Sequence, residues 1–281
     1  MKILSLPLLL IIPCFFNMQQ CNTTFHPLKI PAREPSMEAG SAFMSRIADL
    51  PLKEREEEIY RALVAGNMPQ FLRNLVTITD ELTDASGVVH KVEYQVMPDY
   101  LAVGNDADFC RIPMSPNTAQ RLATAFGATL ITATISDHIY ERATVKLAPV
   151  SYLPVGNANE LVSKFVEHNR EIERQFKEAE GKYGELVAGI KKDVILSVRI
   201  AAQPTKVVIY GWHRPDGKPI QPVYSGHVNW YVDYSHGIRL MNNQVIIDGE
   251  SRLISEILKD PVLFRLFSNE EEPMMQPVYP L

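Results

Sequence analysis

The order in which helical and strand-like patterns follow each other is the feature that most constrains the fold of this chain. Apolar residues recur at helical spacing in the first half, most clearly over residues 158–180, where Phe165, Ile172 and Phe176 share one face. Residues 194–247 change to short runs of β-branched and aromatic residues separated by turn residues. Helices followed by a block of strands predict an α+β fold, because alternating α/β folds interleave the two.

The first half is predicted to be mainly helical with a small sheet, and the second to be a mostly antiparallel strand-rich block closed by helices. Ser115 and Pro116 are typical of a helix start, and Gly127 is typical of a helix end. The expected helices cover residues 41–50, 52–65, 116–126, 136–143, 158–180, 251–258 and 261–267. The expected strands cover residues 76–79, 88–97, 100–103, 145–147, 194–200, 206–210, 220–224, 228–233, 238–241 and 244–247.

The N-terminus differs in kind from the rest of the chain. Lys2 precedes an apolar run over residues 3–16, which predicts a secretory signal peptide, residues 1–20, that is too short to span a bilayer comfortably. Cys21 follows directly, so we expect it to be the lipidated first residue of a lipoprotein, although the preceding Met-Gln-Gln departs from the usual pattern. We therefore expect an exported protein, periplasmic or on the outer surface and anchored in the membrane. An uncleaved anchor is the alternative.

The rest of the chain has the composition of an ordinary globular protein. Its 281 residues include 46% hydrophobic and 22% charged residues, which is enough for a core of normal size. A net charge of −5 offers no basic surface for nucleic acid. We predict a tether, one α+β domain and a loose acidic tail at residues 21–40, 41–268 and 269–281, with two lobes at 41–150 and 151–268 as the alternative division.

Residues 206–241 gather the side chains best suited to chemistry. They include three of the seven histidines and both tryptophans. Histidine and aspartate supply general acids and bases, and both can bind zinc. We therefore predict a functional site formed by His213, His227, Asp233 and His236, with a bend near residues 235–237 bringing them together. The alternative is that each histidine is a structural residue bonded to the backbone.

The leading hypothesis is a hydrolase that acts on a cell-envelope or extracellular polymer, with peptide or amide bonds favoured. One histidine would be the general base, and Asp233 would orient it. One version uses zinc held by His227, Asp233 and His236, or by His213 in place of His236, with an open fourth position, and the other needs no cofactor. The residue types and their order are similar to those of zinc carboxypeptidases that cut peptidoglycan stems. However, the Ser-x-His-x-x-Gly-x-x-x-Asp pattern and the His-x-His pair of those enzymes are absent.

Two further residues are candidate nucleophiles. Cys110 is the only thiol that remains once residues 1–20 are removed and Cys21 is acylated, and its place before the histidines is that of papain-like envelope peptidases. The Asp-Cys-Ser-x-Leu signature of those peptidases is absent, and a small apolar filler is the alternative role. Ser235 lacks the Gly-x-Ser-x-Gly elbow, so its alternative is a structural hydroxyl.

Aromatic and basic side chains near the histidines are candidates for substrate binding. Trp212, Trp230 and Tyr234 suit sugars or peptide side chains, and they suit a sheet core equally well. Arg239 could hold a carboxylate through its planar guanidinium. These residues support an alternative function from another class, a non-catalytic surface lipoprotein that binds a glycan or peptide through an aromatic cleft.

Three motifs resemble an uncharacterised family of secreted bacterial proteins. They are Arg-Ile-Pro-Met-Ser-Pro-Asn-Thr-Ala-Gln-Arg-Leu from Arg111, Tyr-Gly-Trp-His ending at His213, and Tyr-Val-Asp-Tyr-Ser-His-Gly-Ile-Arg-Leu from Tyr231. The resemblance covers most of the chain after the signal peptide. It transfers no reaction and no site roles.

Overall fold

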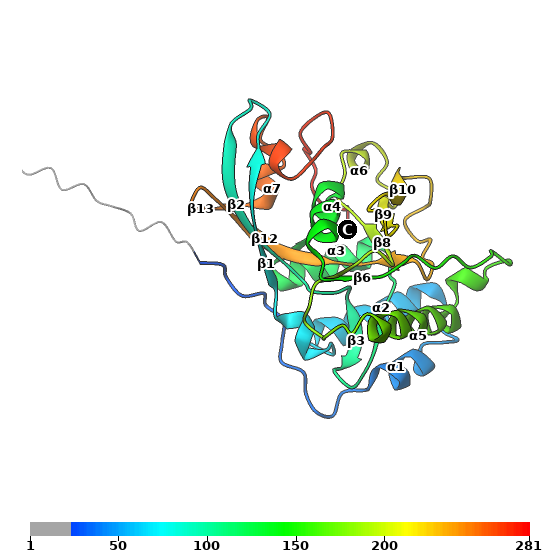
Figure 1. The fold of residues 1–281 in the computed structure, drawn as a ribbon. Coiled ribbons are helices and arrows are strands. Elements are labelled where there is room, and N and C mark those ends of the chain that lie inside the picture. The colour runs from blue at the N-terminus through cyan, green and yellow to red at the C-terminus, as the bar shows by residue number, and fades with distance from the viewer. Residues whose placement is uncertain (1–23) are drawn as a thin grey trace, which may run out of the picture.

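The structure is a computed structural model that describes residues 24–281 (Figure 1). The predicted signal peptide and the lipid attachment at Cys21 lie outside the described residues. Within residues 24–281, no helix is long and apolar enough to cross a membrane. Helices and mainly antiparallel sheets both contribute to the fold, which confirms the predicted α+β class.

The largest sheet has five strands and draws on both halves of the chain. Its order is β1-β2-β12-β13, with β5 also paired to β12, and all of its pairs are antiparallel. Because β12 pairs with β2, the two halves share one sheet and one buried core. Its strands are β1 (Val76–Thr83), β2 (Val89–Val96), β5 (Ala128–Leu130), β12 (Leu240–Ile247) and β13 (Glu250–Leu253).

A second sheet, in the order β10-β9-β8-β11, carries several of the candidate residues. β8 pairs parallel with β11 and antiparallel with β9. Its strands are β8 (Lys192–Val194), β9 (Ile209–His213), β10 (Pro219–Tyr224) and β11 (His236–Gly237). Two strand pairs complete the sheets: β3 (Ala102–Asn105) with β4 (Asp108–Arg111), and β6 (Val145–Lys146) with β7 (Val187–Ala188).

Helices surround these sheets. Helix α4 packs against β9, α2 packs against α3, and α1, α2 and α5 occupy the lower right of Figure 1. The α-helices are α1 (Gly40–Arg46), α2 (Leu52–Val64), α3 (Pro116–Phe126), α4 (Ala133–Arg142), α5 (Val162–Glu178), α6 (Arg199–Ala202) and α7 (Ile254–Ile257). The 3-10 helices in the described part of the chain are η1 (Gln70–Arg73), η2 (Ala158–Glu160) and η3 (Leu263–Leu266).

Local signals placed the start and the end of α3 correctly. The Ser115 hydroxyl accepts a hydrogen bond from the Thr118 amide at 3.2 Å, which satisfies one of the free donors of the first turn. Pro116 follows at the first helical position, where its missing N–H costs nothing. Gly127 ends the helix in the left-handed conformation, with φ of 68°.

Two predicted strands were wrong over most of their length. The strand predicted at residues 194–200 ends at Val194, because the Glu270 carboxylate accepts hydrogen bonds from the Ser197 hydroxyl and from the Val198 amide. These bonds hold the chain in a turn that leads into α6. The segment predicted as a strand at residues 228–233 is irregular and joins a neighbour only through an isolated bridge.

The predicted helix at residues 251–258 was also partly wrong. Asp248 and Gly249 both have positive φ, 51° and 85°, which is the conformation of a tight hairpin turn. The turn sends the next four residues back along β12 as β13, so that α7 begins only at Ile254.

The segments expected to be a tether and a loose tail are packed against the fold where they are described. Leu28 and Ile30 pack on the core. Near the C-terminus, the buried Tyr279 hydroxyl donates to the Ile195 carbonyl at 2.8 Å and accepts from the Val208 amide at 3.0 Å. Because the tail is rich in acidic residues, its sequence did not indicate that Tyr279 would be buried.

Candidate functional site

Two short strands bring Lys192 and His236 together. β8 and β11 are parallel neighbours, and Lys192 is paired with His236 in the register. Paired residues of neighbouring strands point to the same face of a sheet, so these two side chains share a face. Asp193 is next along β8 and therefore points to the opposite face.

A tight turn fixes Asp233 immediately before β11. One carboxylate oxygen of Asp233 accepts hydrogen bonds from the Ser235 amide at 2.8 Å and from the Ser235 hydroxyl at 2.5 Å. The His236 amide donates to the Asp233 carbonyl at 3.2 Å and closes the turn. This is the bend predicted near residues 235–237, and it places Asp233 beside His236.

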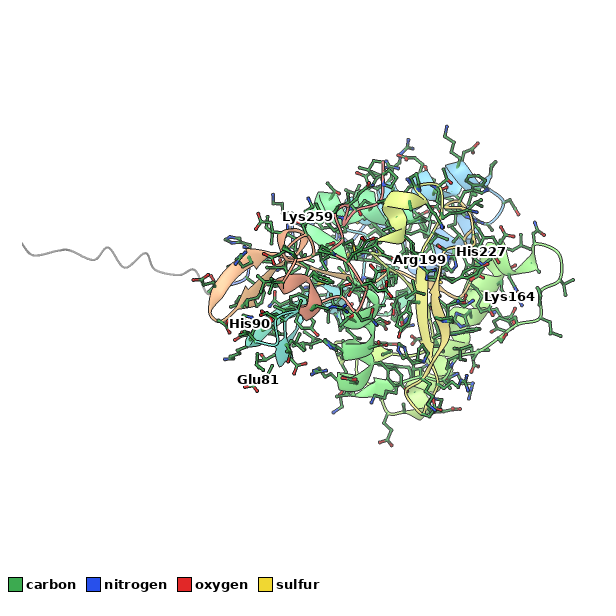
Figure 2. The ribbon with its side chains drawn as sticks, turned by 90° about the horizontal axis from the view of Figure 1, so that it is seen from above. Glu81, His90, Lys164, Arg199, His227 and Lys259 are labelled. Carbon is green, nitrogen blue, oxygen red and sulfur yellow. The ribbon has the colours of Figure 1, made fainter. Side chains whose placement is uncertain are left out.

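The rings of Tyr231 and His227 lie next to this turn. The Tyr231 hydroxyl donates to the second carboxylate oxygen of Asp233 at 3.2 Å. The Tyr231 ring stacks on His227 with centroids 4.3 Å apart, and its centroid lies 5.9 Å from that of His236. His236 and Asp233 are buried, whereas His227 and Tyr231 are half-buried. His227 lies toward the side of the molecule away from His90 and Glu81 (Figure 2).

We call Lys192, His227, Tyr231, Asp233 and His236 the β8–β11 site. Burial lowers the pKa of His236 to about 4 and also lowers the pKa values of His227 and Lys192, because the charged forms lose water. Burial alone would raise the pKa of Asp233, but the positive charge of His236 and the bonds from Ser235 outweigh it and hold that pKa at about 2. At neutral pH the site therefore has neutral imidazoles beside an ionised carboxylate.

Several buried polar atoms near the site lack hydrogen-bond partners within residues 24–281. They include both ring nitrogens of His236 and the side-chain oxygen of Asn159. The His168 ring contacts Tyr234 at 4.9 Å, and the Lys191 ammonium donates to the Tyr234 carbonyl at 2.7 Å. Buried polar atoms of this kind are normally bonded to water or to a ligand.

His168 was not predicted as part of this region. The helical spacing contained the signal, because His168 follows Phe165 by three residues and precedes Ile172 by four, which places it on the buried face of α5. Lys192 was also absent from the predicted site residues. Its half-buried position depends on the pairing of β8 with β11, which no local pattern shows.

Among the predicted zinc ligands, Asp233 is already hydrogen-bonded to neighbouring side chains. Both oxygens of Asp233 accept hydrogen bonds from Ser235 and Tyr231. In the described part of the chain, no three His, Cys, Asp or Glu side chains converge closely enough to hold a metal ion.

His213 lies apart from the other predicted site residues. Its Nε2 contacts a carboxylate oxygen of Asp137 at 2.8 Å, and its ring stacks on Tyr140 at 4.6 Å, so it packs with α4. The Tyr210 hydroxyl donates to the same carboxylate at 2.8 Å. These side chains line a separate cleft of about 520 Å³. The structure therefore unites three of the four predicted residues and places the fourth elsewhere.

Trp212 supports the site from inside the protein. It is buried, its indole N–H donates to the Ile190 carbonyl at 3.0 Å, and the Lys192 ammonium lies 4.6 Å from its ring centroid. Its backbone has φ of 58°, a conformation that is costly for a bulky residue and that recurs at functional sites.

The other predicted site residues are buried among structural partners. Burial raises the pKa of the Cys110 thiol to about 12, so the thiolate needed for nucleophilic attack is scarce at neutral pH. Arg239 donates to the carbonyls of Met97 and Val187, at 2.8 and 2.5 Å. The Tyr234 hydroxyl accepts from the Tyr152 amide at 2.9 Å.

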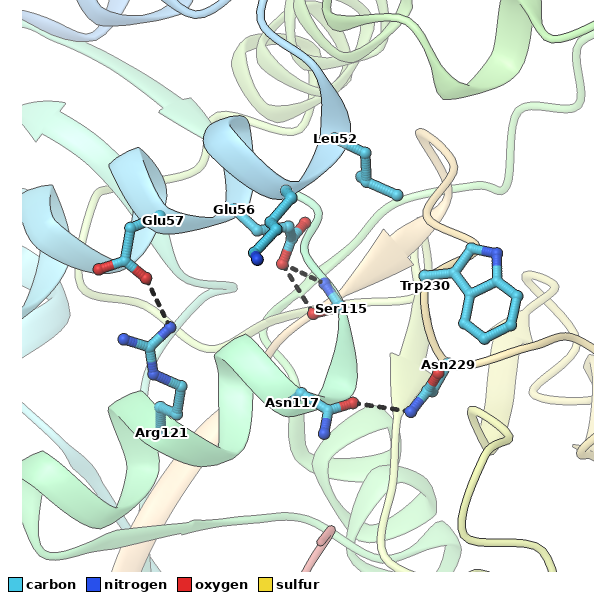
Figure 3. Close-up of a pocket in the computed structure, with 9 residues that line it drawn as sticks. Leu52, Glu56, Glu57, Ser115, Asn117, Arg121, Asn229 and Trp230 are labelled. Carbon is cyan, nitrogen blue, oxygen red and sulfur yellow. Dashed lines mark hydrogen bonds and ion pairs between the residues drawn. The ribbon is translucent and has the colours of Figure 1, made fainter. Parts of the chain in front are cut away.

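Trp230 is the predicted substrate-binding residue that reaches the surface. Its side chain is 59% exposed and lines a groove of about 530 Å³ between α2 and the start of α3 (Figure 3). The chain matches no family model, no curated protein and no solved structure.

Proposed function

We propose that the protein is an exported hydrolase that cleaves peptide or amide bonds in a cell-envelope or extracellular polymer through the β8–β11 site. The observation that supports this most is the series His227–Tyr231–Asp233, in which a half-buried imidazole stacks on a phenol that is bonded to an ionised carboxylate. Perturbed titratable groups gathered in this way are typical of functional sites.

The proposed reaction assigns one role to each group. His227, neutral at pH 7, takes a proton from water as the water oxygen attacks the scissile carbonyl carbon. The Lys192 ammonium stabilises the negative charge that develops on the carbonyl oxygen. The carbon–nitrogen bond then breaks, and the proton passes from His227 to the leaving amine. Asp233 offsets the positive charge formed on His227 and fixes the Tyr231 ring that supports it.

Export and anchoring are part of the same proposal. The apolar run after Lys2 and the cysteine that follows it support secretion and lipid attachment at Cys21. An anchored enzyme would meet polymers of the envelope without diffusing away. Mass spectrometry of the mature N-terminus should find a lipid-modified cysteine, and an unmodified N-terminus further along the chain would contradict this part.

Product analysis tests the type of bond. Purified envelope polymer is incubated with the protein, and the products are identified by mass spectrometry. New primary amines paired with new carboxylates would support amide hydrolysis. New reducing ends without new amines would show that the protein cleaves glycosidic bonds instead.

The non-catalytic alternative draws on the exposed Trp230 in its groove. A surface lipoprotein of that kind would bind the polymer without changing it. Binding without any product, in wild type and in a His227→Gln variant alike, would favour this alternative over hydrolysis.

A further inference from the structure

The groove beside Trp230 is built from three segments that are distant in the sequence. Leu52 and Glu56 come from α2, Asn117 comes from the first turn of α3, and Asn229 and Trp230 come from an irregular loop (Figure 3). The Asn229 side-chain amide donates to the Asn117 side-chain oxygen at 3.0 Å, which ties the loop to α3. The groove therefore has a defined shape, with a volume of about 530 Å³.

Trp230 offers a flat apolar surface to this groove. Its side chain is 59% exposed, and burying so large an apolar ring inside the fold would have been favourable. Leu52 lines the groove with it. An aromatic face beside polar groups suits the apolar face of a sugar ring, whose hydroxyl groups point outward around its edge.

Glu56 supplies an acceptor that the fold leaves without a donor. One of its carboxylate oxygens accepts from the Ser115 amide at 3.0 Å and from the Ser115 hydroxyl at 2.7 Å. The other oxygen is buried and has no hydrogen-bond partner within residues 24–281. A buried acceptor without a donor is unfavourable, and a ligand hydroxyl or amide N–H would satisfy it.

The charges around the groove balance each other. Arg121 is paired with Glu57 at 2.8 Å and lies over the Tyr60 ring. Lys53 and Glu56 contribute one charge of each sign. A groove wall without excess charge suits a neutral ligand that is rich in hydrogen-bond donors. A saccharide fits this description better than a charged peptide does.

One loop connects the groove to the β8–β11 site. Asn229 and Trp230 lie between His227 and Tyr231 in the sequence, so one loop serves both.

We propose that this groove binds a neutral sugar unit of the polymer, with its ring on Trp230 and a hydroxyl group donating to Glu56. The substrate is then a glycan that carries peptide or other amide-linked groups. This inference rests on the proposed function for its link to cleavage, but binding in the groove can be measured without any turnover.

The test is calorimetric titration of the full chain with a hexasaccharide of N-acetylglucosamine. We expect wild type to bind, and we expect Trp230→Ala and Glu56→Gln each to weaken binding by about tenfold. Val89→Ala is the matched control, because Val89 is also 59% exposed but lies on the β1–β2 hairpin. It should bind like wild type.

The outcomes separate this inference from the proposed function. His227→Gln should keep full binding, so binding without turnover in this variant supports the groove. The sugar assignment is overturned if wild type does not bind the hexasaccharide, if both groove variants bind it unchanged, or if a neutral peptide binds in a Trp230-dependent way instead. A wild-type protein that binds the sugar but releases no new amines from purified envelope polymer would refute the hydrolase and leave the groove intact.

Discussion

The burial of His236 has a measurable consequence for stability. Its imidazole is 1% exposed, and burial lowers its pKa from 6.5 to about 4. Between those pH values the unfolded chain binds a proton that the folded chain does not, so stability falls as the pH falls through this window. Each pKa unit corresponds to about 1.4 kcal/mol, so His236 accounts for a loss of about 3 kcal/mol between pH 7 and pH 4.

The variant His236→Met removes the titrating group and keeps an apolar side chain of similar size. Urea unfolding of both proteins, followed by circular dichroism at pH 7, 6, 5 and 4, gives the free energy of unfolding at each pH. The stability advantage of wild type over the variant should shrink by about 3 kcal/mol from pH 7 to pH 4. Any constant packing cost of the substitution cancels in this comparison.

His90 provides a control of opposite sign. Its hydrogen bonds with Asp248 and with Asp84 raise its pKa, so its contribution is fully present below pH 6.5 and is lost as the pH rises through the raised value. The advantage of wild type over His90→Gln should therefore grow on acidification. If the His236→Met difference stays constant with pH, the buried neutral imidazole, and with it the electrostatics of the β8–β11 site, is refuted.

Three further predictions follow from the titratable groups. Hydrolysis should have a bell-shaped pH profile, rising as His227 loses its proton and falling as Lys192 loses its own; a flat profile from pH 5 to 10 would exclude both roles. Burial lowers the pKa of Lys191 to about 7, so wild-type stability should rise between pH 7 and 10, where the unfolded chain binds a proton that folded Lys191 does not, and Lys191→Met should show a smaller rise in a thermal-shift series. The Cys110 thiol should resist iodoacetamide in the folded protein at pH 8 and react only in urea; rapid labelling of the native state would restore it as a candidate nucleophile.

Local patterns predicted elements whose causes are local. The start of α3 depends on Ser115 and Pro116, and its end depends on Gly127, so the sequence around them was sufficient. The strand expected after Val194 failed because its hydrogen bonds are made by Glu270, which is distant in sequence. Propensity is a weak guide wherever a tertiary contact of this kind competes with it.

The site was partly predictable for the same reason. Asp233 and His236 belong to one tight turn, and His227 lies in the loop just before that turn. Their proximity therefore depends on residues that are close together in the sequence. His213 sits at the end of β9, and its partner Asp137 lies on α4, far away in the sequence. The whole fold determines which face of a sheet a helix covers. The spacing of residues within 206–241 therefore cannot predict that α4 lies against His213.

The most direct test of the central claim compares two histidines that the structure separates. Release of new amino groups from purified envelope polymer is measured for wild type, His227→Gln and His213→Gln. We predict that His227→Gln loses about 100-fold or more of the rate with an unchanged melting temperature, and that His213→Gln stays close to wild type. Full activity in His227→Gln, or a comparable loss in His213→Gln, would contradict the assignment of catalysis to the β8–β11 site.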